Sequence, residues 1–347
     1  MPAWHAPLEV GRLPRELTSF VGRQEQVEDV AQVLCGAGLV TLVGVGGVGK
    51  TRLALRAAAA VQDQYAYGAW LVELAQINDP TMVATAVAHA LRIRERPGLD
   101  MLEVLSLVLR ERQLLLVLDN CEHVLLGCAE LVSTLLRTCE NLSVLATSRE
   151  PLGVSGEVVY SVPPLPVASA EDSFEQLVAC DAVRLLVARI QTTRPGLQLS
   201  ESTAPLAGRI CRLVDGLPLG IELAASRARS MSLAEIADRL SDPLSLLTVG
   251  PRTAPRRQQT LRATIDWSYE LLTDAEQRLL RRLAIFTGGC TFDGVQAVCS
   301  GADSDPNDLT MLLDRLVGHS LVVADTRGEH TRFSLLETVR QYCLERV

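Results

Sequence analysis

Lysine is nearly absent from this chain of 347 residues. Lysine and arginine together number 33, and all of them except Lys50 are arginine. A compact ammonium and a planar guanidinium are not interchangeable where a point charge must fit among closely spaced backbone amides. The glycines around Lys50 suggest such a geometry, although coding bias could also leave a single lysine.

Aromatic residues are also scarce, and the chain lacks an excess of positive charge. Aromatic side chains make up 4% of the residues and hydrophobic residues 48%, so the cores should be aliphatic. The net charge of −8 argues against broad nucleic-acid binding, because such binding depends on an excess of cationic side chains. The length is that of two or three domains, each with a core of its own.

Cys-x-x-Cys pairs, an apolar leader and long apolar runs are lacking as well. The nine cysteines are scattered and odd in number, which favours buried free thiols in a reducing compartment. No segment approaches the roughly 20 apolar residues of a membrane span, and no basic and apolar leader opens the chain. We therefore expect a cytoplasmic protein with no membrane partner.

Residues 18–165 alternate short apolar runs with amphipathic stretches. Unbroken apolar runs predict buried parallel strands at 38–44, 69–74, 114–119 and 142–148. Helical patterns separate these runs, as in an α/β domain with a parallel sheet and right-handed crossovers. An N-terminal extension over 1–17 precedes this domain.

The strand pattern ends at a proline-rich linker over 161–173. Residues 166–250 then predict a small helical domain. A second break, 241–260, leads into a third domain over 251–347. Helices followed by two short strands around a turn, and then a last helix, predict a winged helix there.

The segment GVGGVGKT, Gly44 to Thr51, fits the motif G-x-x-x-x-G-K-[ST]. It lies between an apolar strand and a helical run, as a phosphate-binding loop requires. Glycines let successive N–H groups converge on phosphate oxygens, and the helix N-terminus adds its dipole. Lys50 is expected to bridge the β- and γ-phosphates and Thr51 to bind Mg²⁺. The residues assigned to nucleotide binding here are Gly44, Gly46, Gly47, Val48, Gly49, Lys50, Thr51 and Arg52.

Asp119 ends the apolar run LLLVLD and matches the Walker B position, where a carboxylate faces Mg²⁺. An aspartate at a strand end can also be an ordinary turn residue. Many hydrolysing relatives carry a second acid next, which polarises water, whereas this chain has Asn120. Glu122 is a displaced candidate for that catalytic acid. Nucleotide binding is thus the firmer expectation, and slow ATPase activity stays open.

With these motifs the chain resembles the STAND class of P-loop NTPases, specifically the NB-ARC-like (AP-ATPase) module of bacterial LuxR-type and AfsR-type transcriptional regulators. The resemblance covers almost the whole chain. It implies a signalling switch in which ATP or ADP, with Mg²⁺, lies between the α/β domain and the two following domains. It also implies a partner protein or self-association. A Mg²⁺-dependent ATPase with real turnover is the alternative.

The resemblance assigns roles outside the loop. It implies that Val21, Gly22 and Arg23 line the adenine pocket, and that Pro218 of the GLPL element packs near the adenine. Arg149, in LATSRE, stands where the family has a catalytic sensor arginine that reaches the γ-phosphate. The ordinary alternatives are a turn, a helix start and a surface arginine, respectively.

One motif of the family is altered. Related modules close the inactive state with Met-His-Asp, where this chain has Leu335, Leu336 and Glu337. A locked ADP state is therefore expected to be weaker or built differently. Family members are usually fused to an effector and to sensor repeats, which this sequence does not show, so a split subunit or a remnant of a longer regulator is expected.

Direct DNA binding is a further hypothesis, which the sequence disfavours. The expected recognition stretch, 307–323, carries Asp308 and Asp314 against Arg315, so contacts to phosphates would be few. A basic cluster in the second linker is expected to be solvated or to make an intramolecular contact. It consists of Arg252, Arg256 and Arg257.

Overall fold

The chain forms two compact units in the computed structural model. The first unit consists of Met1–Gly44 and Lys50–Val162, and the second of Val45–Gly49 and Pro163–Val347. The structure describes residues 9–16, 18–240, 260–299, 306–326 and 328–346. Residues 241–259 of the expected second linker, with Arg252, Arg256 and Arg257, lie outside this part.

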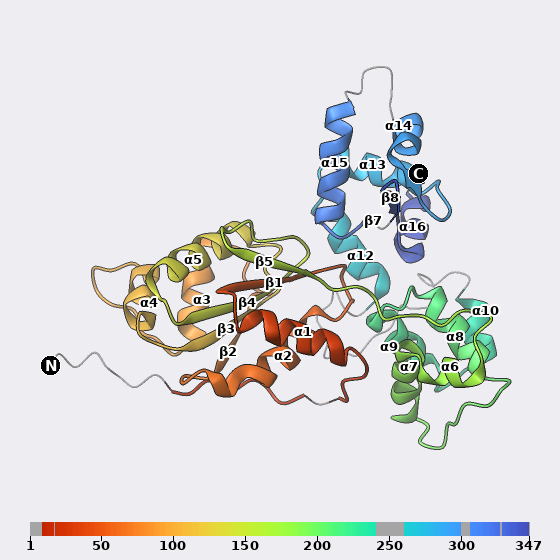
Figure 1. Ribbon diagram of the computed structural model, residues 1–347, viewed down its shortest axis with the longest axis horizontal. Helices are drawn as coiled ribbons and strands as arrows, with labels where there is room; N and C mark the ends of the chain where they lie inside the picture. Colours follow the sequence, from red (N-terminus) through yellow and green to blue (C-terminus); the bar gives the residue numbers. More distant parts are fainter. Residues whose placement is uncertain (1–8, 17, 241–259, 300–305, 327, 347) are drawn as a thin grey trace. The chain divides into compact units, whose positions relative to one another are not determined.

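A five-stranded parallel sheet is the centre of the first unit (Figure 1). The strand order is β2-β3-β4-β1-β5, and every pairing is parallel. The strands are β1 Leu39–Val43, β2 Ala69–Glu73, β3 Leu114–Asp119, β4 Leu142–Ser148 and β5 Glu157–Ser161. The four expected strands and the parallel α/β architecture are thus confirmed, whereas β5 was not expected.

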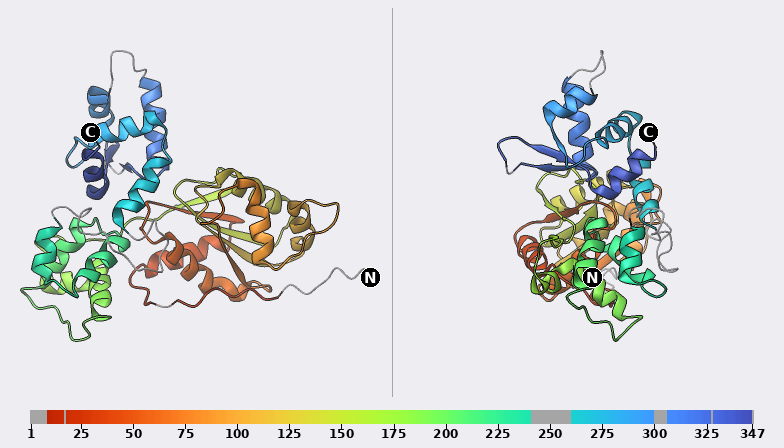
Figure 2. Two further views of the ribbon diagram at one scale, coloured as in Figure 1. Left: turned by 180° about the vertical axis from the view of Figure 1, so that it is seen from behind. Right: turned by 90° about the vertical axis from the view of Figure 1, so that its right-hand side faces the viewer.

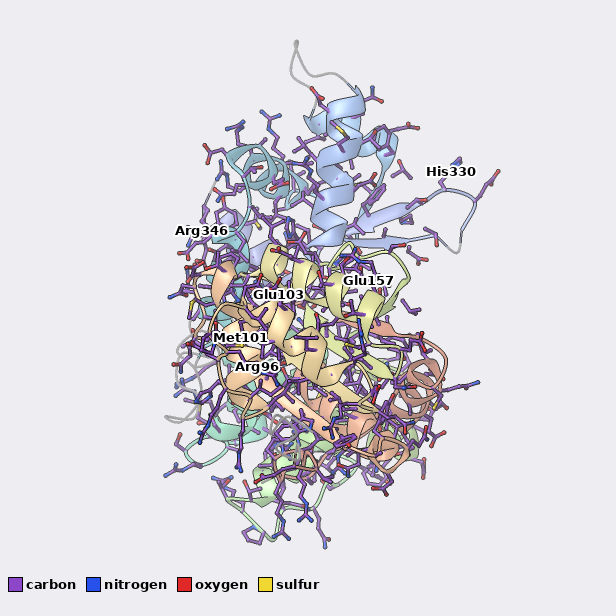
Figure 3. All side chains as sticks on the ribbon, turned by 90° about the vertical axis from the view of Figure 1, so that its left-hand side faces the viewer. Arg96, Met101, Glu103, Glu157, His330 and Arg346 are labelled. Atoms are coloured by element: carbon purple, nitrogen blue, oxygen red, sulfur yellow. The ribbon has the colours of Figure 1, made fainter. Side chains whose placement is uncertain are left out.

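The fifth strand lies at the edge of the sheet. Among the described residues it pairs only with β1, and its side chains face solvent at least in part, so it lacks the unbroken apolar run of a central strand. Its first residue, Glu157 (Figure 3), accepts hydrogen bonds from the backbone N–H groups of Leu152, Gly153 and Val154. This carboxylate closes the turn that leads into the strand.

Helices cover both faces of the sheet (Figure 1). α1 Gln24–Leu34 and α2 Lys50–Val61 lie on one face. The other face carries α3 Val83–Ala90, α4 Met101–Leu109 and α5 Leu125–Thr138. The leucines of β3 are fully buried between these layers, and burial of each contributes about 2 kcal/mol to folding.

The second unit contains a helical part and a winged-helix part. The helical part comprises α6 Phe174–Ala179, α7 Asp181–Gln191, α8 Ala204–Leu213, α9 Pro218–Arg227 and α10 Leu233–Arg239. Pro218 occupies the first position of α9, where its missing N–H leaves no hydrogen bond unmade.

The winged-helix part shows the expected hairpin and last helix. Strand β8 lies between β6 and β7, antiparallel to both, and the β7–β8 hairpin projects from the helices of this part (Figure 2). Its elements are α12 Leu261–Glu270, α13 Asp274–Leu283, β6 Cys290–Thr291, α14 Phe292–Cys299, α15 Pro306–Gly318, β7 Val323–Asp325, β8 Arg332–Ser334 and α16 Glu337–Leu344.

The described cysteines are free and mostly buried, as expected. All eight cysteines whose side chains are described are free thiols, and six of them are buried, where they pack as small apolar groups. In the part of the chain that the structure describes, no helix has the length and hydropathy to cross a membrane.

Candidate functional site

The glycine-rich loop joins the end of β1 to the start of α2. Gly47 and Gly49 have φ angles of 80° and 96°, a region that is readily open only to glycine. Val48 is fully buried and anchors the loop, with its N–H directed to the carbonyl of Val45 at 3.3 Å. A loop of this shape, followed by the first turn of a 12-residue helix, can bind an anion through backbone N–H groups.

Lys50 folds back over this loop. Its Nζ donates a hydrogen bond to the carbonyl oxygen of Gly44 at 2.6 Å. Burial lowers the pKa of Lys50 to about 8, Glu122 and Asp119 raise it, and Arg149 lowers it. An anion bound in the loop would favour the charged form of this ammonium.

Asp119 and Thr51 meet at the end of β3. The carboxylate oxygen Oδ1 of Asp119 accepts hydrogen bonds from Thr51 Oγ1 at 2.6 Å and from Thr147 Oγ1 at 2.7 Å. One carboxylate and one hydroxyl suit Mg²⁺, which prefers oxygen ligands and takes the others from phosphates and water. No group of three or more His, Cys, Asp or Glu suited to a metal occurs among the described residues, so phosphate oxygens would have to complete the coordination.

Thr147 was not among the expected site residues, because a threonine within an apolar strand has no distinct sequence signal. Besides donating to Asp119, its Oγ1 accepts the N–H of Asn120 at 2.9 Å. Thr147 thus fixes both the carboxylate and the turn that follows it.

We expect Thr147→Val to weaken the binding of Mg²⁺-nucleotide by about tenfold, because the hydrogen bond to the charged Asp119 is lost together with the acceptor for the N–H of Asn120. Titration with fluorescent ADP, in Mg²⁺ and again in EDTA, measures this effect, and the loss should be confined to Mg²⁺. Thr41→Val is a matched control: Thr41 is fully buried in β1, and its Oγ1 has no hydrogen-bond partner. Equal losses in Mg²⁺ and EDTA would contradict this role of Thr147.

Asn120 adopts a left-handed turn, with a φ of 69°. Its side-chain nitrogen lies 3.2 Å from His123 Nδ1, and His123 Nε2 lies 2.9 Å from the carbonyl of Leu74. Because a carbonyl only accepts, Nε2 carries the proton and Nδ1 accepts from the Asn120 amide. Asn120 thus stands at the position where an acid would polarise water, and its amide is hydrogen-bonded to His123.

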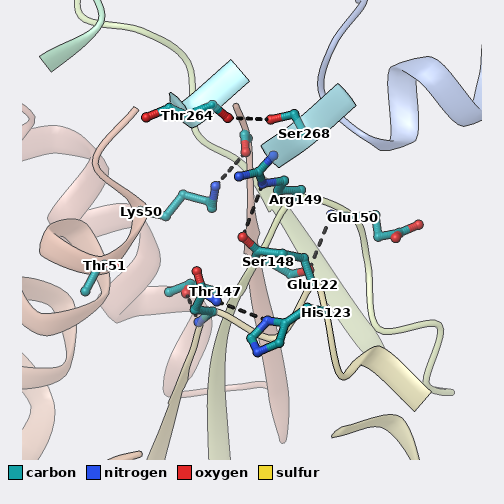
Figure 4. A network of polar contacts seen from close by, with 12 residues as sticks. Lys50, Thr51, Glu122, His123, Thr147, Ser148, Arg149, Glu150, Thr264 and Ser268 are labelled. Atoms are coloured by element: carbon teal, nitrogen blue, oxygen red, sulfur yellow. Dashed lines mark hydrogen bonds and ion pairs between the residues drawn. The ribbon is translucent and has the colours of Figure 1, made fainter. Parts of the chain in front are cut away.

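Glu122 and Arg149 form a buried pair close to Lys50 (Figure 4). Arg149 Nε donates to Glu122 Oε1 at 3.2 Å. The side chains of Arg149 and Glu122 are only 5% and 6% exposed, so Arg149 is not the surface arginine of the ordinary alternative. The displaced acid and the sensor-type arginine of the sequence are thus brought together.

Arg52 holds the segment that leads into α1. Its guanidinium donates to the carbonyls of Thr18 and Ser19, each at 3.0 Å. The chain then forms a left-handed turn through Gly22 and Arg23, with φ angles of 74° and 62°. Val21 and Gly22 are half-buried, and Arg23 is buried at the start of α1. These two hydrogen bonds connect Arg52 to the segment before α1.

The GLPL element contacts the glycine-rich loop within the second unit, which includes Val45–Gly49. The N–H of Leu219, the residue after Pro218, donates to the carbonyl of Gly47 at 3.2 Å. A Cβ atom at Gly47 would lie 2.9 Å from the Cβ of Leu219. Close approach to Leu219 is thus a second reason for glycine at this position.

The carboxylate of Asp215 lies at the N-terminus of α16, next to the residues where the family motif is altered. Its carboxylate accepts from the N–H groups of Glu337 and Thr338, at 3.0 and 2.9 Å, and from Thr338 Oγ1 at 2.8 Å. Burial raises the pKa of Asp215, and the hydrogen bonds from Thr338 and Glu337 oppose this shift. A carboxylate of the helical part therefore satisfies the first amides of the helix. No sequence motif indicated this residue.

Two domain families match the chain. Residues 23–174 match the NB-ARC domain, and residues 272–347 match a winged helix-turn-helix domain. An uncharacterised protein of Mycobacterium tuberculosis (strain ATCC 25618 / H37Rv) is 40% identical over 336 residues, which are 96% of this chain and 82% of that protein. The chain thus contains an NB-ARC domain and a winged helix-turn-helix domain, and it belongs to the same family as this mycobacterial protein.

Longer relatives of this NB-ARC protein include transcriptional regulators. A candidate HTH-type transcriptional regulator of the same M. tuberculosis strain is 47% identical over 309 residues, 89% of this chain and 34% of that protein. The regulatory protein AfsR of Streptomyces coelicolor is 26% identical over 98% of this chain and 34% of its own length. The chain thus spans about a third of the length of these relatives, and the resemblance to AfsR-type regulators is confirmed.

The fold of this NB-ARC protein is also found in a Walker-type ATPase of Pyrococcus abyssi. The two structures have a TM-score of 0.61, with 15% sequence identity, over 97% of this chain and 99% of that one. At this identity the likeness shows the fold alone, which is that of a P-loop NTPase.

Proposed function

We propose that this NB-ARC protein is a nucleotide-dependent signalling switch that binds ATP or ADP with Mg²⁺. The observation that carries the proposal is the contact between Thr51 and Asp119 at the end of the glycine-rich loop, with Lys50 folded over that loop. Together these groups supply what a phosphate chain and Mg²⁺ require: converging N–H groups, one ammonium and two oxygen ligands.

The nucleotide content of the purified protein tests this proposal. Denaturing freshly purified protein should release ADP or ATP, identified by chromatography. Protein stripped of nucleotide should bind fluorescent ADP at micromolar concentrations or below. Lys50→Ala, purified in the same way, should carry none. Wild-type protein that carried no nucleotide and failed to bind ADP would sink the proposal.

Hydrolysis is proposed to be slow or absent. The acids near the loop already have partners, since Asp119 accepts from two threonines and Glu122 pairs with Arg149. Asn120, tied to His123, replaces the acid that would polarise water. The alternative, an ATPase with real turnover, is supported by the grouping of Lys50, Asp119 and Arg149, which could stabilise a phosphoryl transition state.

We propose that the winged-helix part acts within the switch and that direct DNA binding is not the main role of this chain. Leu309, Leu313 and Leu316 of α15 are buried, and Arg315 lies 3.7 Å from the buried Glu276. The helix buries its apolar face, and its one arginine, Arg315, is 62% exposed but lies beside a carboxylate, so the helix offers few cations to phosphates. The chain would serve transcriptional control in the cytoplasm through a protein partner or self-association.

A further inference from the structure

Glu122 and Arg149 lie at the ends of two neighbouring parallel strands. Glu122 follows β3 and Arg149 follows β4, so both lie at the carboxyl ends of the strands, where Asp119 also lies. Their Nε to Oε1 distance is 3.2 Å, and both side chains are almost completely withdrawn from water. Because solvent cannot replace either partner, each buried charge depends on the other.

The charges around Lys50 balance without a nucleotide. Glu122, Arg149 and Asp119 all act electrostatically on Lys50, which gives one cluster of two cations and two carboxylates. A γ-phosphate would add negative charge to this cluster. Its best partner is the guanidinium, which can bind phosphate oxygens in a bidentate fork. That guanidinium is already held by Glu122.

The same contact argues against Glu122 as the acid that activates water. A carboxylate oxygen that accepts from a guanidinium is neutralised by it and directed toward it. A general base has to accept a proton from water instead. Glu122 is therefore better placed to control Arg149 than to act on water.

We propose that the carboxylate of Glu122 pairs with Arg149 when no γ-phosphate is bound, and so substitutes for that phosphate. This pairing sets the preference of the site between ADP and ATP. This inference rests on the proposed nucleotide binding. When ATP binds, Arg149 exchanges the carboxylate for the γ-phosphate. Breaking the pair with Glu122 costs free energy, so ATP gains less affinity from its γ-phosphate than it would without Glu122. The exchange also releases Glu122, which belongs to the segment after β3.

Glu122→Gln tests the inference, because it removes the charge and keeps the shape. Calorimetric titration with Mg²⁺ and either ADP or the non-hydrolysable β,γ-imido analogue of ATP gives the ratio of the two affinities. We expect ADP binding within about threefold of wild type and a rise of about tenfold or more in the analogue-to-ADP ratio, since the guanidinium no longer leaves a carboxylate. Glu122→Asp, with a shorter charged side chain, should give a smaller rise.

Glu222→Gln is the matched control. Glu222 Oε1 accepts from Arg189 Nε at 2.9 Å, a pair of the same atoms in the second unit, and the variant should leave the ratio unchanged. In the background Arg149→Gln, adding Glu122→Gln should have no further effect on the ratio, because the two changes act through one contact.

Two results would overturn the inference. An unchanged ratio in Glu122→Gln would make the pair a purely structural one, and a lowered ratio would mean that Glu122 aims Arg149 at the γ-phosphate. If Glu122→Gln does not fold, Glu122→Asp decides by the same criterion. Failure of wild-type protein to bind ADP is a different result, which would overturn the proposed function and the inference with it.

Discussion

Lys50→Arg is expected to lose nucleotide binding almost as completely as Lys50→Ala, although it keeps the charge. The ammonium lies 2.6 Å from the carbonyl of Gly44, and a planar guanidinium is too large for a loop closed so tightly. A unit charge at ~4 Å is worth on the order of 4 kcal/mol at an effective dielectric constant of ~20, so Lys50→Ala should bind at least about 100-fold more weakly. Lys50→Arg should approach the same loss, because its guanidinium does not fit where the ammonium lies. Titration with fluorescent ADP measures the loss.

The reverse exchange on the same helix is the control. Arg56 of α2 forms an ion pair with Glu16 at 2.6 Å, and its side chain is 44% exposed. Arg56→Lys should leave ADP affinity within about twofold of wild type, because the ion pair is partly exposed and Lys keeps its charge. Near-normal binding by Lys50→Arg would make the single lysine an accident of composition.

Asp215→Ala is expected to destabilise the second unit by about 2–4 kcal/mol. The change removes the acceptor of two part-buried N–H groups, those of Glu337 and Thr338, and each donor left without a partner costs about 1–3 kcal/mol. Guanidinium denaturation followed by far-ultraviolet circular dichroism measures the loss in nucleotide-free protein.

Asp215→Asn should lose less than Asp215→Ala. The amide oxygen of Asn can still accept at one of the two carboxylate positions, whereas the amide nitrogen cannot replace the other acceptor and Ala replaces neither. Asp238→Ala is the matched control, because Asp238 pairs with Arg209 at 3.0 Å but both side chains are largely exposed. A loss at Asp215 no larger than at Asp238 would show that this carboxylate does not hold α16.

The parts of the fold that could be predicted are those in which local sequence reports local structure. Runs such as LLLVLD are buried on both faces, so their composition alone indicates central parallel strands. The edge strand EVVYS, Glu157–Ser161, carries no such signal because its side chains are largely exposed. Its place in the sheet depends on pairing with β1, more than 100 residues earlier in the chain.

The same limit applies to the candidate site. Lys50, Thr51 and Asp119 follow from two motifs of fixed spacing. The pairing of Glu122 with Arg149 does not, since 27 residues separate them and only the adjacency of β3 and β4 brings them together. Asp215 and Thr338 are 123 residues apart, in parts of the chain that no motif connects. Contacts of this kind require strand order and helix packing, which sequence patterns do not encode one residue at a time.

The solitary lysine also makes the loop chemically addressable. Reagents that acylate amines have one side-chain target among 347 residues, Lys50 Nζ, and peptide mapping separates its mass increment from that of the N-terminal α-amino group. Lys50 Nζ is part-buried and donates to Gly44, so its modification requires the side chain to leave the loop. The extent of labelling would therefore record how often the loop opens, without any engineered probe.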